Sequence, residues 1–180
     1  MRDGSENRDR RSIRLPHFDY SQPGGYYVTI CSHEKYHLFG SVTDGEVNLT
    51  PLGQIVAEEW NTIPARRDNV VIDSYCVMPN HFHGILFITE TRRGTACRAQ
   101  EPSRRRFGNS QAGSLSKIVG SFKSSVARRI NILKNSPGAP VWQRNYYEHV
   151  IRNEADLAEK REYIKSNPLK WELDEYYCCD

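Results

Sequence analysis

Residues 70–89 read VVIDSYCVMPNHFHGILFIT, and this stretch decides the fold. Two runs rich in β-branched and aromatic residues, 70–78 and 81–89, are separated by Pro79-Asn80, a turn signal. We therefore expect a β-hairpin that lies at the centre of a sheet. Because side chains alternate across a strand, His81 and His83 face one side of that sheet and Phe82 faces the other.

The segments on either side predict further strands and three helices. The patterns that carry these expectations are strand-like runs at 26–32, 38–42, 46–49 and 141–151, helical periodicity from Thr50-Pro51 to Pro64 and from Ser114 to Leu133, and a capped helix from Asn153 to about Pro168. Asp44-Gly45 is a hairpin turn, so the first three runs read as an antiparallel meander. The order predicts an α+β fold, a mostly antiparallel sheet with helices on one face, ferredoxin-like or RNA-recognition-like.

Length and composition favour one soluble domain. The 180 residues fit a single domain at residues 25–180, preceded by a flexible basic arm at 1–24 and interrupted by a mobile basic loop at 91–113. No apolar run is long enough to cross a bilayer, and the amino terminus has no secretory apolar region, so we expect a cytoplasmic protein. The five cysteines show no CxxC pair and are expected to be free thiols.

Positive charge is concentrated in one part of the chain. The net charge is +3, but residues 91–150 hold twelve Lys or Arg and two acids, so the remainder is acidic. Such a surface predicts a polyanionic partner, while a solvated arginine-rich loop is the alternative explanation. The helix from Ser114 contributes basic residues and no acid.

Two pairs of residues suggest chemistry. His81 and His83 present two imidazoles to one point, which suits a divalent metal, although a structural pair on an open sheet is an equal alternative. Tyr163 and Asn167 are four apart and share a helical face. They are a phenol and an amide oxygen for the same site, or else a core tyrosine and a helix cap. His149 is a further candidate metal ligand or proton shuttle, or simply a surface histidine.

The combination of motifs resembles a known family. The blocks that carry the resemblance are RSIRL (11–15), DYSQPG (19–24), MPNHFHG (78–84), VWQRNYYEH (141–149) and YIKSNP (163–168). Together they resemble the REP-associated tyrosine transposases, which belong to the single-tyrosine HUH transposase superfamily together with transposases of bacterial insertion sequences. The resemblance extends over nearly the whole chain and implies the HUH nuclease fold.

The resemblance implies roles for individual residues. It makes Tyr163 the catalytic nucleophile and His81, His83 and Asn167 the ligands of Mg²⁺ or Mn²⁺. The expected reaction cleaves and rejoins single-stranded DNA beside repeat hairpins of the repetitive extragenic palindrome type, through a 5′-phosphotyrosine. The expected location is the nucleoid. The residues we expect to bind DNA are Arg11, Arg14, Lys117, Lys123, Arg128, Arg129 and Arg144.

Several alternatives stay open at this level. A rolling-circle HUH nuclease, a domesticated protein that only binds single-stranded nucleic acid, and a metal-dependent hydrolase that uses water would all share some of these motifs. Tyr146 and Tyr147 are rival nucleophiles, for which packing or stacking against a base is the other interpretation. The sequence does not distinguish a monomer from a homodimer.

Overall fold

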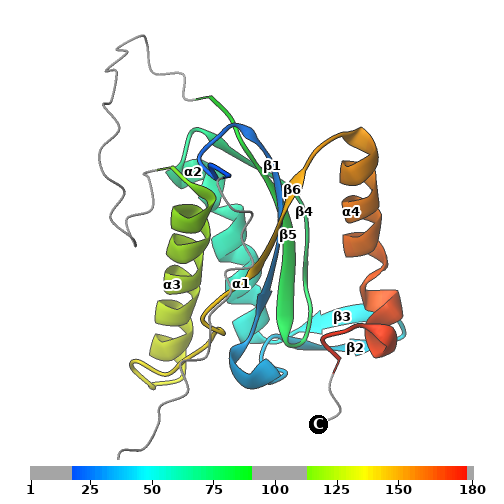
Figure 1. The fold of residues 1–180 in the computed structure, drawn as a ribbon. Helices are drawn as coiled ribbons and strands as arrows, with labels where there is room; N and C mark the ends of the chain where they lie inside the picture. The colour runs from blue at the N-terminus through cyan, green and yellow to red at the C-terminus, as the bar shows by residue number, and fades with distance from the viewer. Residues whose placement is uncertain (1–17, 91–112, 178–180) are drawn as a thin grey trace, which may run out of the picture.

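The computed structural model describes residues 18–90 and 113–177. The strands are β1 (Gly24–Cys31), β2 (Gly40–Thr43), β3 (Glu46–Leu49), β4 (Val70–Val77), β5 (His81–Ile88) and β6 (Tyr147–Ile151). The helices are α1 (Pro51–Asn61), α2 (Ile63–Arg66), α3 (Leu115–Leu133) and α4 (Glu154–Ser166), with two 3-10 helices, η1 (His33–Lys35) and η2 (Pro168–Leu173) (Figure 1). Arg11, Arg14, most of the predicted arm and nearly all of the predicted basic loop lie outside the described residues.

The main sheet has the strand order β4-β5-β1-β6, and each neighbouring pair is antiparallel. The chain passes from β1 through α1 and α2 to β4, turns directly into β5, and returns through α3 to β6. This is the ferredoxin-like α+β arrangement that the sequence predicts. The hairpin at 70–89 also forms as expected, with β5 in the interior of the sheet and β4 at its edge.

Two expectations about strands were wrong. The first three strands do not form a meander, because β1 already has β5 and β6 as neighbours, and β2 and β3 form a separate two-stranded sheet. The strand expected at 141–151 begins only at Tyr147. Residues before it follow an irregular path, in which an isolated bridge pairs Ser32 with Trp142.

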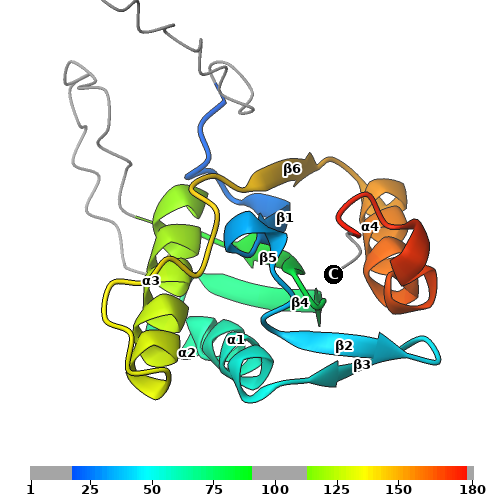
Figure 2. The same cartoon turned by 90° about the horizontal axis from the view of Figure 1, so that it is seen from below.

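Helices cover both faces of the sheet, so the expectation of helices on one face was also wrong. In Figures 1 and 2, α1 and α3 lie on one face and α4 lies on the other. The reason is that β1 and β5 are buried along almost their whole length, without the alternation of a half-exposed strand. Tyr27 and Ile85 on the second face therefore need cover, which Leu157 and Ile164 of α4 provide.

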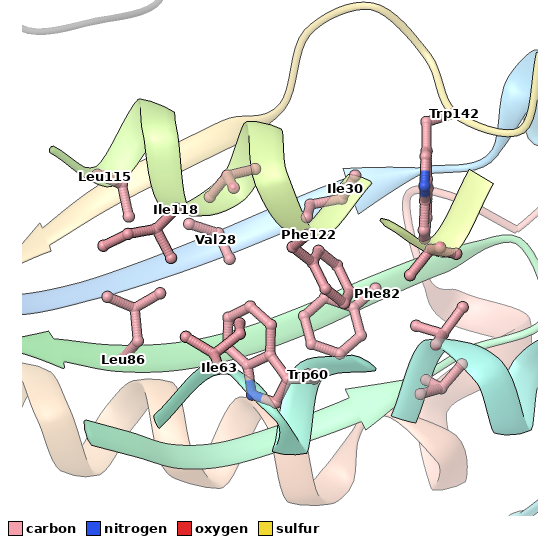
Figure 3. Close-up of a cluster of buried hydrophobic side chains, with 14 of the residues drawn as sticks. Val28, Ile30, Trp60, Ile63, Phe82, Leu86, Leu115, Ile118, Phe122 and Trp142 are labelled. Carbon is pink, nitrogen blue, oxygen red and sulfur yellow. The ribbon is translucent and has the colours of Figure 1, made fainter. Parts of the chain in front are cut away.

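The larger hydrophobic core lies between the sheet and helices α1 and α3 (Figure 3). Trp60 is fully buried, and its ring centre lies 4.7 Å from that of Phe82 and 5.2 Å from that of Phe122. A Cβ atom at Gly84 would lie 2.7 Å from a ring carbon of Trp60, so only glycine fits at this point of β5. Among the described residues, no helix has the length and apolar character needed to cross a membrane.

Candidate metal and nucleophile site

The strand register places both histidines on the face of the sheet that α4 covers. Phe82, between them, points into the larger core, so the alternation predicted from the sequence is confirmed. Both imidazoles are fully buried. Part of their cover comes from the chain after η2, because the ring centre of Tyr176 lies 4.8 Å from that of His81.

The two imidazoles turn one nitrogen each toward a common point. His81 Nε2 and His83 Nε2 are 2.9 Å apart. The opposite nitrogens are held by neighbours: His81 Nδ1 lies 2.8 Å from Asn80 Oδ1, and His83 Nδ1 lies 2.7 Å from the Tyr27 hydroxyl. Because Asn80 Oδ1 can only accept, His81 carries its hydrogen on Nδ1, and its Nε2 has a lone pair that can accept from His83 Nε2 or bind a metal ion.

Burial keeps both imidazoles neutral. It lowers the pKa of His81 to about 4, against the opposing effect of the Asp174 carboxylate. It also lowers the pKa of His83 well below its ordinary value, and the neighbouring His81 acts in the same direction. A neutral imidazole is the form that binds a metal ion, so the pair is ready as a ligand at neutral pH.

Asp174 completes a group that sequence reasoning missed. Its carboxylate and the nitrogens of His81 and His83 all lie within 4.8 Å of one another. Asp174 stands in an acidic stretch beyond the last predicted helix, where nothing in its spacing marks it as a ligand. Only the course of η2, which turns the chain back toward the sheet, brings it to the histidines.

Asn167 lies beside this group with one oxygen unused. The residue is buried, and its Nδ2 donates to Asp174 Oδ2 at 2.6 Å. Its Oδ1 is buried and has no hydrogen-bond partner among the described residues. A buried carbonyl oxygen without a partner is costly, and coordination of a cation would remove that cost.

Tyr163 stands at the rim of the same group. The four-residue spacing puts it on the face of α4 that carries Asn167, and its ring centre lies 5.2 Å from that of His83. Its hydroxyl is 3.4 Å from Asp174 Oδ2, and the residue is 38% exposed. Partial burial raises the pKa of Tyr163 to about 12, and the nearby Asp174 and Glu175 carboxylates add to this effect.

A cleft lies beside Tyr163, and the two buried histidines are not among the residues that line it. It has a volume of about 320 Å³, and Tyr163, Asn167, Lys170 and Asp174 are among the residues that line it.

Polar contacts hold α4 in place over the sheet. Arg161 donates from Nε and Nη2 to the two carboxylate oxygens of Asp73 on β4, at 2.9 and 2.6 Å. At the other end of the helix, His149 Nε2 lies 2.9 Å from Asp156 Oδ1. The position of the tyrosine thus depends on polar contacts as well as on the small apolar cluster under the helix.

Known proteins are similar to this chain in sequence and in fold. An uncharacterized protein of Haemophilus influenzae Rd is 41% identical over 173 residues, 93% of each chain. A second protein of that organism, provisionally named a REP-associated tyrosine transposase, is 25% identical over 103 residues, 53% of this chain and 47% of that protein. A solved REP-associated tyrosine transposase, bound to a REP hairpin, has the same fold, with a TM-score of 0.58 and 19% identity over 89% of this chain and 74% of the other. No protein-family model matches.

The chain is similar to the REP-associated tyrosine transposases. This similarity supports a transposase-like activity on DNA in general terms. The cluster of two histidines and an aspartate is compatible with a divalent metal.

The rival residues are not part of the His81, His83 and Asp174 group. Tyr146 packs against the larger core, on the other side of the sheet from the histidines. Tyr147 is on the same face as His83 but belongs to β6, and β1 separates the two. His149 is engaged by Asp156 and is not part of the His81, His83 and Asp174 group.

The basic residues of the described chain separate into two groups. Lys117, Arg128 and Arg144 are exposed. Lys123 donates to the carbonyl oxygens of residues 143–145, and Arg129 is paired with Glu58 and Glu59, so their charges are used inside the fold. Helix α3 lies on the sheet face opposite α4, and its basic residues therefore do not meet the histidines directly (Figure 1).

Proposed function

We propose that this protein cleaves and rejoins single-stranded DNA beside repeat hairpins, through a covalent bond between Tyr163 and a 5′-phosphate. The observation that carries the proposal is that Tyr163, Asn167 and Asp174 line one cleft, with the ring centre of Tyr163 5.2 Å from that of the buried His83. The general transposase-like activity of the family supports it. The REP hairpin bound to the solved relative supports a hairpin as the DNA partner here, and the nucleoid as the place of action.

The residues present fit a divalent cation. Two neutral imidazoles, the Asp174 carboxylate and the unpartnered Asn167 Oδ1 form a mixed nitrogen and oxygen donor set. Such a set suits Mg²⁺ or Mn²⁺, which we propose that His81, His83 and Asp174 hold with Asn167. When bound, the cation would neutralise negative charge on the phosphate that is cleaved.

The chain's own groups account for the covalent step. The Tyr163 oxygen attacks the phosphorus, the bond from phosphorus to the 3′ oxygen breaks, and that oxygen leaves as a 3′-hydroxyl after taking a proton from solvent. Asp174 Oδ2 is the acceptor nearest to the phenol proton, at 3.4 Å. Because the pKa of Tyr163 is about 12, the phenol is protonated at neutral pH and must lose its proton during the attack.

Rejoining follows the same scheme in reverse. The hydroxyl of a second 3′ end attacks the phosphotyrosine, a new phosphodiester forms, and Tyr163 is released with its proton. The energy of the broken bond is kept in the protein–DNA ester, so no nucleotide cofactor is needed. Lys170 in the cleft, together with the exposed Lys117, Arg128 and Arg144, would contact phosphates, and Arg11 and Arg14 are further candidates from the sequence.

The test is formation of a covalent adduct. Labelled hairpin DNA from the repeats beside the gene, carrying single-stranded extensions, is incubated with the protein and Mg²⁺, Mn²⁺ or EDTA, and run on a denaturing protein gel. We expect a metal-dependent labelled band that Tyr163→Phe abolishes. The matched control is Tyr36→Phe, which removes the hydroxyl of an exposed tyrosine on the chain after η1 and is expected to keep the band.

Other outcomes select other functions. An adduct that persists in Tyr163→Phe would remove this tyrosine from the proposed role. Cleaved DNA without a labelled band would indicate water as the nucleophile. Binding without cleavage in any metal would indicate a protein that only binds nucleic acid.

A further inference from the structure

The far edge of the sheet brings an exposed aromatic ring close to the histidines. β6 is an edge strand, and in its register with β1 Tyr147 lies opposite Thr29, which in turn lies opposite His83 on β5. These three residues form a row across one face of the sheet. Thr29 Oγ1 lies 2.9 Å from His83 Nδ1, so only one buried threonine separates Tyr147 from a proposed metal ligand.

The side chain of Tyr147 does not pack into the larger core as that of its neighbour Tyr146 does. Tyr146 packs against the larger core, whereas the side chain of Tyr147 is 46% exposed. Its ring meets Tyr27 edge-on, with centres 6.3 Å apart, and Tyr163 meets Tyr27 edge-on at the same separation. Two exposed tyrosines therefore border the buried Tyr27 and His83, one on β6 and one on α4.

The backbone that leads to Tyr147 is fixed by an unusual contact. Lys123 Nζ donates to the carbonyl oxygens of Gln143, Arg144 and Asn145, at 2.6, 3.2 and 3.4 Å. The backbone N–H of Gln143 donates to the carbonyl of Cys31, which ties the same segment to the end of β1. An aromatic ring on a segment held in this way loses little freedom when a flat partner lies on it.

The surroundings of Tyr147 suit a strand of nucleic acid. Arg144, three residues earlier in the chain, is exposed and positively charged, as a phosphate contact would require. Figure 2 shows β6 between α3, on one face of the sheet, and α4, on the other. A DNA strand that runs from the basic surface of α3 to the cleft at Tyr163 would therefore cross this edge.

We propose that Tyr147 is the platform on which a base of the single-stranded DNA stacks beside the cleaved phosphate. The proposal rests on the proposed function and adds the residue that orients the substrate. Every base has a π face, so stacking on tyrosine holds the strand without reading its sequence. The part of Tyr147 that acts is the ring and not the hydroxyl, for which the described residues provide no hydrogen bond.

The experiment measures binding and base stacking together. Hairpin DNA with a single-stranded extension is made with 2-aminopurine at one extension position at a time, and its fluorescence is followed during titration with protein in EDTA. Stacking on an aromatic ring quenches this base, so wild type should quench it at one or two positions. We expect Tyr147→Leu to lose the quenching and to bind about tenfold more weakly or worse.

Conservative variants separate the ring from the hydroxyl and from the fold. Tyr147→Phe and Tyr147→Trp should lose far less than Tyr147→Leu, since both keep an aromatic face. Tyr36→Leu, a change at an exposed tyrosine in another part of the molecule, is the matched control and should bind as wild type does. Thermal unfolding of each variant shows that the strand edge remains folded.

Each outcome decides the proposal separately from the proposed function. Unchanged affinity and quenching in Tyr147→Leu would overturn stacking, and so would a loss in Tyr147→Phe as large as in Tyr147→Leu. A wild-type protein that binds no such strand overturns it as well. By contrast, a wild type that binds and quenches but never forms a covalent adduct contradicts the proposed cleavage and leaves the stacking platform standing.

Discussion

The two faces of the four-stranded sheet are built from alternate residues of the same strands, yet they bury different chemistry. On the face under α1 and α3, Val28, Ile30, Phe82 and Leu86 join a large apolar cluster. On the face under α4, only four of the described buried residues form the apolar cluster, and the space beside it holds His81, His83 and Asn167. The stretch His81-Phe82-His83-Gly84 contributes to both in turn.

This difference indicates how one strand serves stability and chemistry at once. Apolar burial on the first face supplies free energy of folding, which lets the second face bury groups that are costly to bury. Gly84, which follows the histidines, contributes to the packing of the apolar face, because Trp60 packs where its Cβ would be. The histidines contribute to the chemistry of the other face, because their burial keeps them neutral.

The strongest test of the comparison is a cavity on the apolar face. Trp60→Ala removes a fully buried ring that contacts Phe82 and Phe122. We expect the free energy of unfolding to fall by about 3–5 kcal/mol, as for other buried tryptophan truncations. Chemical denaturation followed by circular dichroism measures it.

The matched change on the other face is Tyr163→Phe, which removes one hydroxyl at the rim of the cleft. It should change the free energy of unfolding by less than about 0.5 kcal/mol while it abolishes the adduct. Equal losses of unfolding free energy in Trp60→Ala and Tyr163→Phe would mean that the two faces contribute alike to stability.

A second test asks whether a metal stabilises the polar face. Binding of a cation to the folded state alone adds about 2.7 kcal/mol when its concentration is 100 times the Kd, which corresponds to a rise in Tm of about 5–10 °C at this size. We expect Mn²⁺ to raise the Tm of wild type relative to EDTA, and His81→Ala to lose that rise. Differential scanning fluorimetry measures both.

The comparison within each variant separates metal binding from folding. His81→Ala changes stability by itself, so the quantity that decides is the difference in Tm with and without Mn²⁺. His33→Ala, outside the His81, His83 and Asp174 cluster, should keep the full difference. A rise that survives in His81→Ala would place the cation elsewhere.

Local periodicity was enough to predict which residues of the candidate site share a face, while their roles come from the resemblance to the transposase family. The two-residue spacing of His81 and His83 and the four-residue spacing of Tyr163 and Asn167 fix shared faces before any tertiary contact is known. Asp174 could not be found in this way, because its place depends on the turn of η2 back to the sheet. The fold class was predictable for the same reason as the histidines, from strand and helix patterns in order.

The roles of the basic residues show where this reasoning stops. Lys123 and Arg129 look alike in the sequence to Lys117 and Arg128, since all four lie on one helix without an acid. Their partners are backbone carbonyls of residues 143–145 in one case and Glu58 and Glu59 of α1 in the other. A helix pattern gives the direction of a side chain but not the neighbour that another segment brings to it.

The smallest expected effect concerns the ion pair that docks α4. The Arg161 guanidinium, through its hydrogen bonds to the carboxylate, lowers the pKa of Asp73 to about 2. A carboxyl whose pKa is lower in the folded than in the unfolded state adds stability above about pH 4, and this is lost as the pH falls toward 2. The pair is partly exposed, so Asp73→Asn should cost about 1 kcal/mol or less at pH 7.

That loss should be local to the polar face. Hydrogen exchange at pH 7 is expected to show faster opening of α4 in Asp73→Asn with unchanged protection of α3, and the stability difference from wild type should shrink between pH 4 and pH 2. Glu159→Gln is the control, because Glu159 is an exposed residue of the same helix whose ion pair in the described part of the chain is with its neighbour Lys160. If hydrogen exchange in Asp73→Asn became faster in α3 and α4 alike, the helices on the two faces would open as one unit. The two faces would then differ in the residues that they bury but not in their local stability.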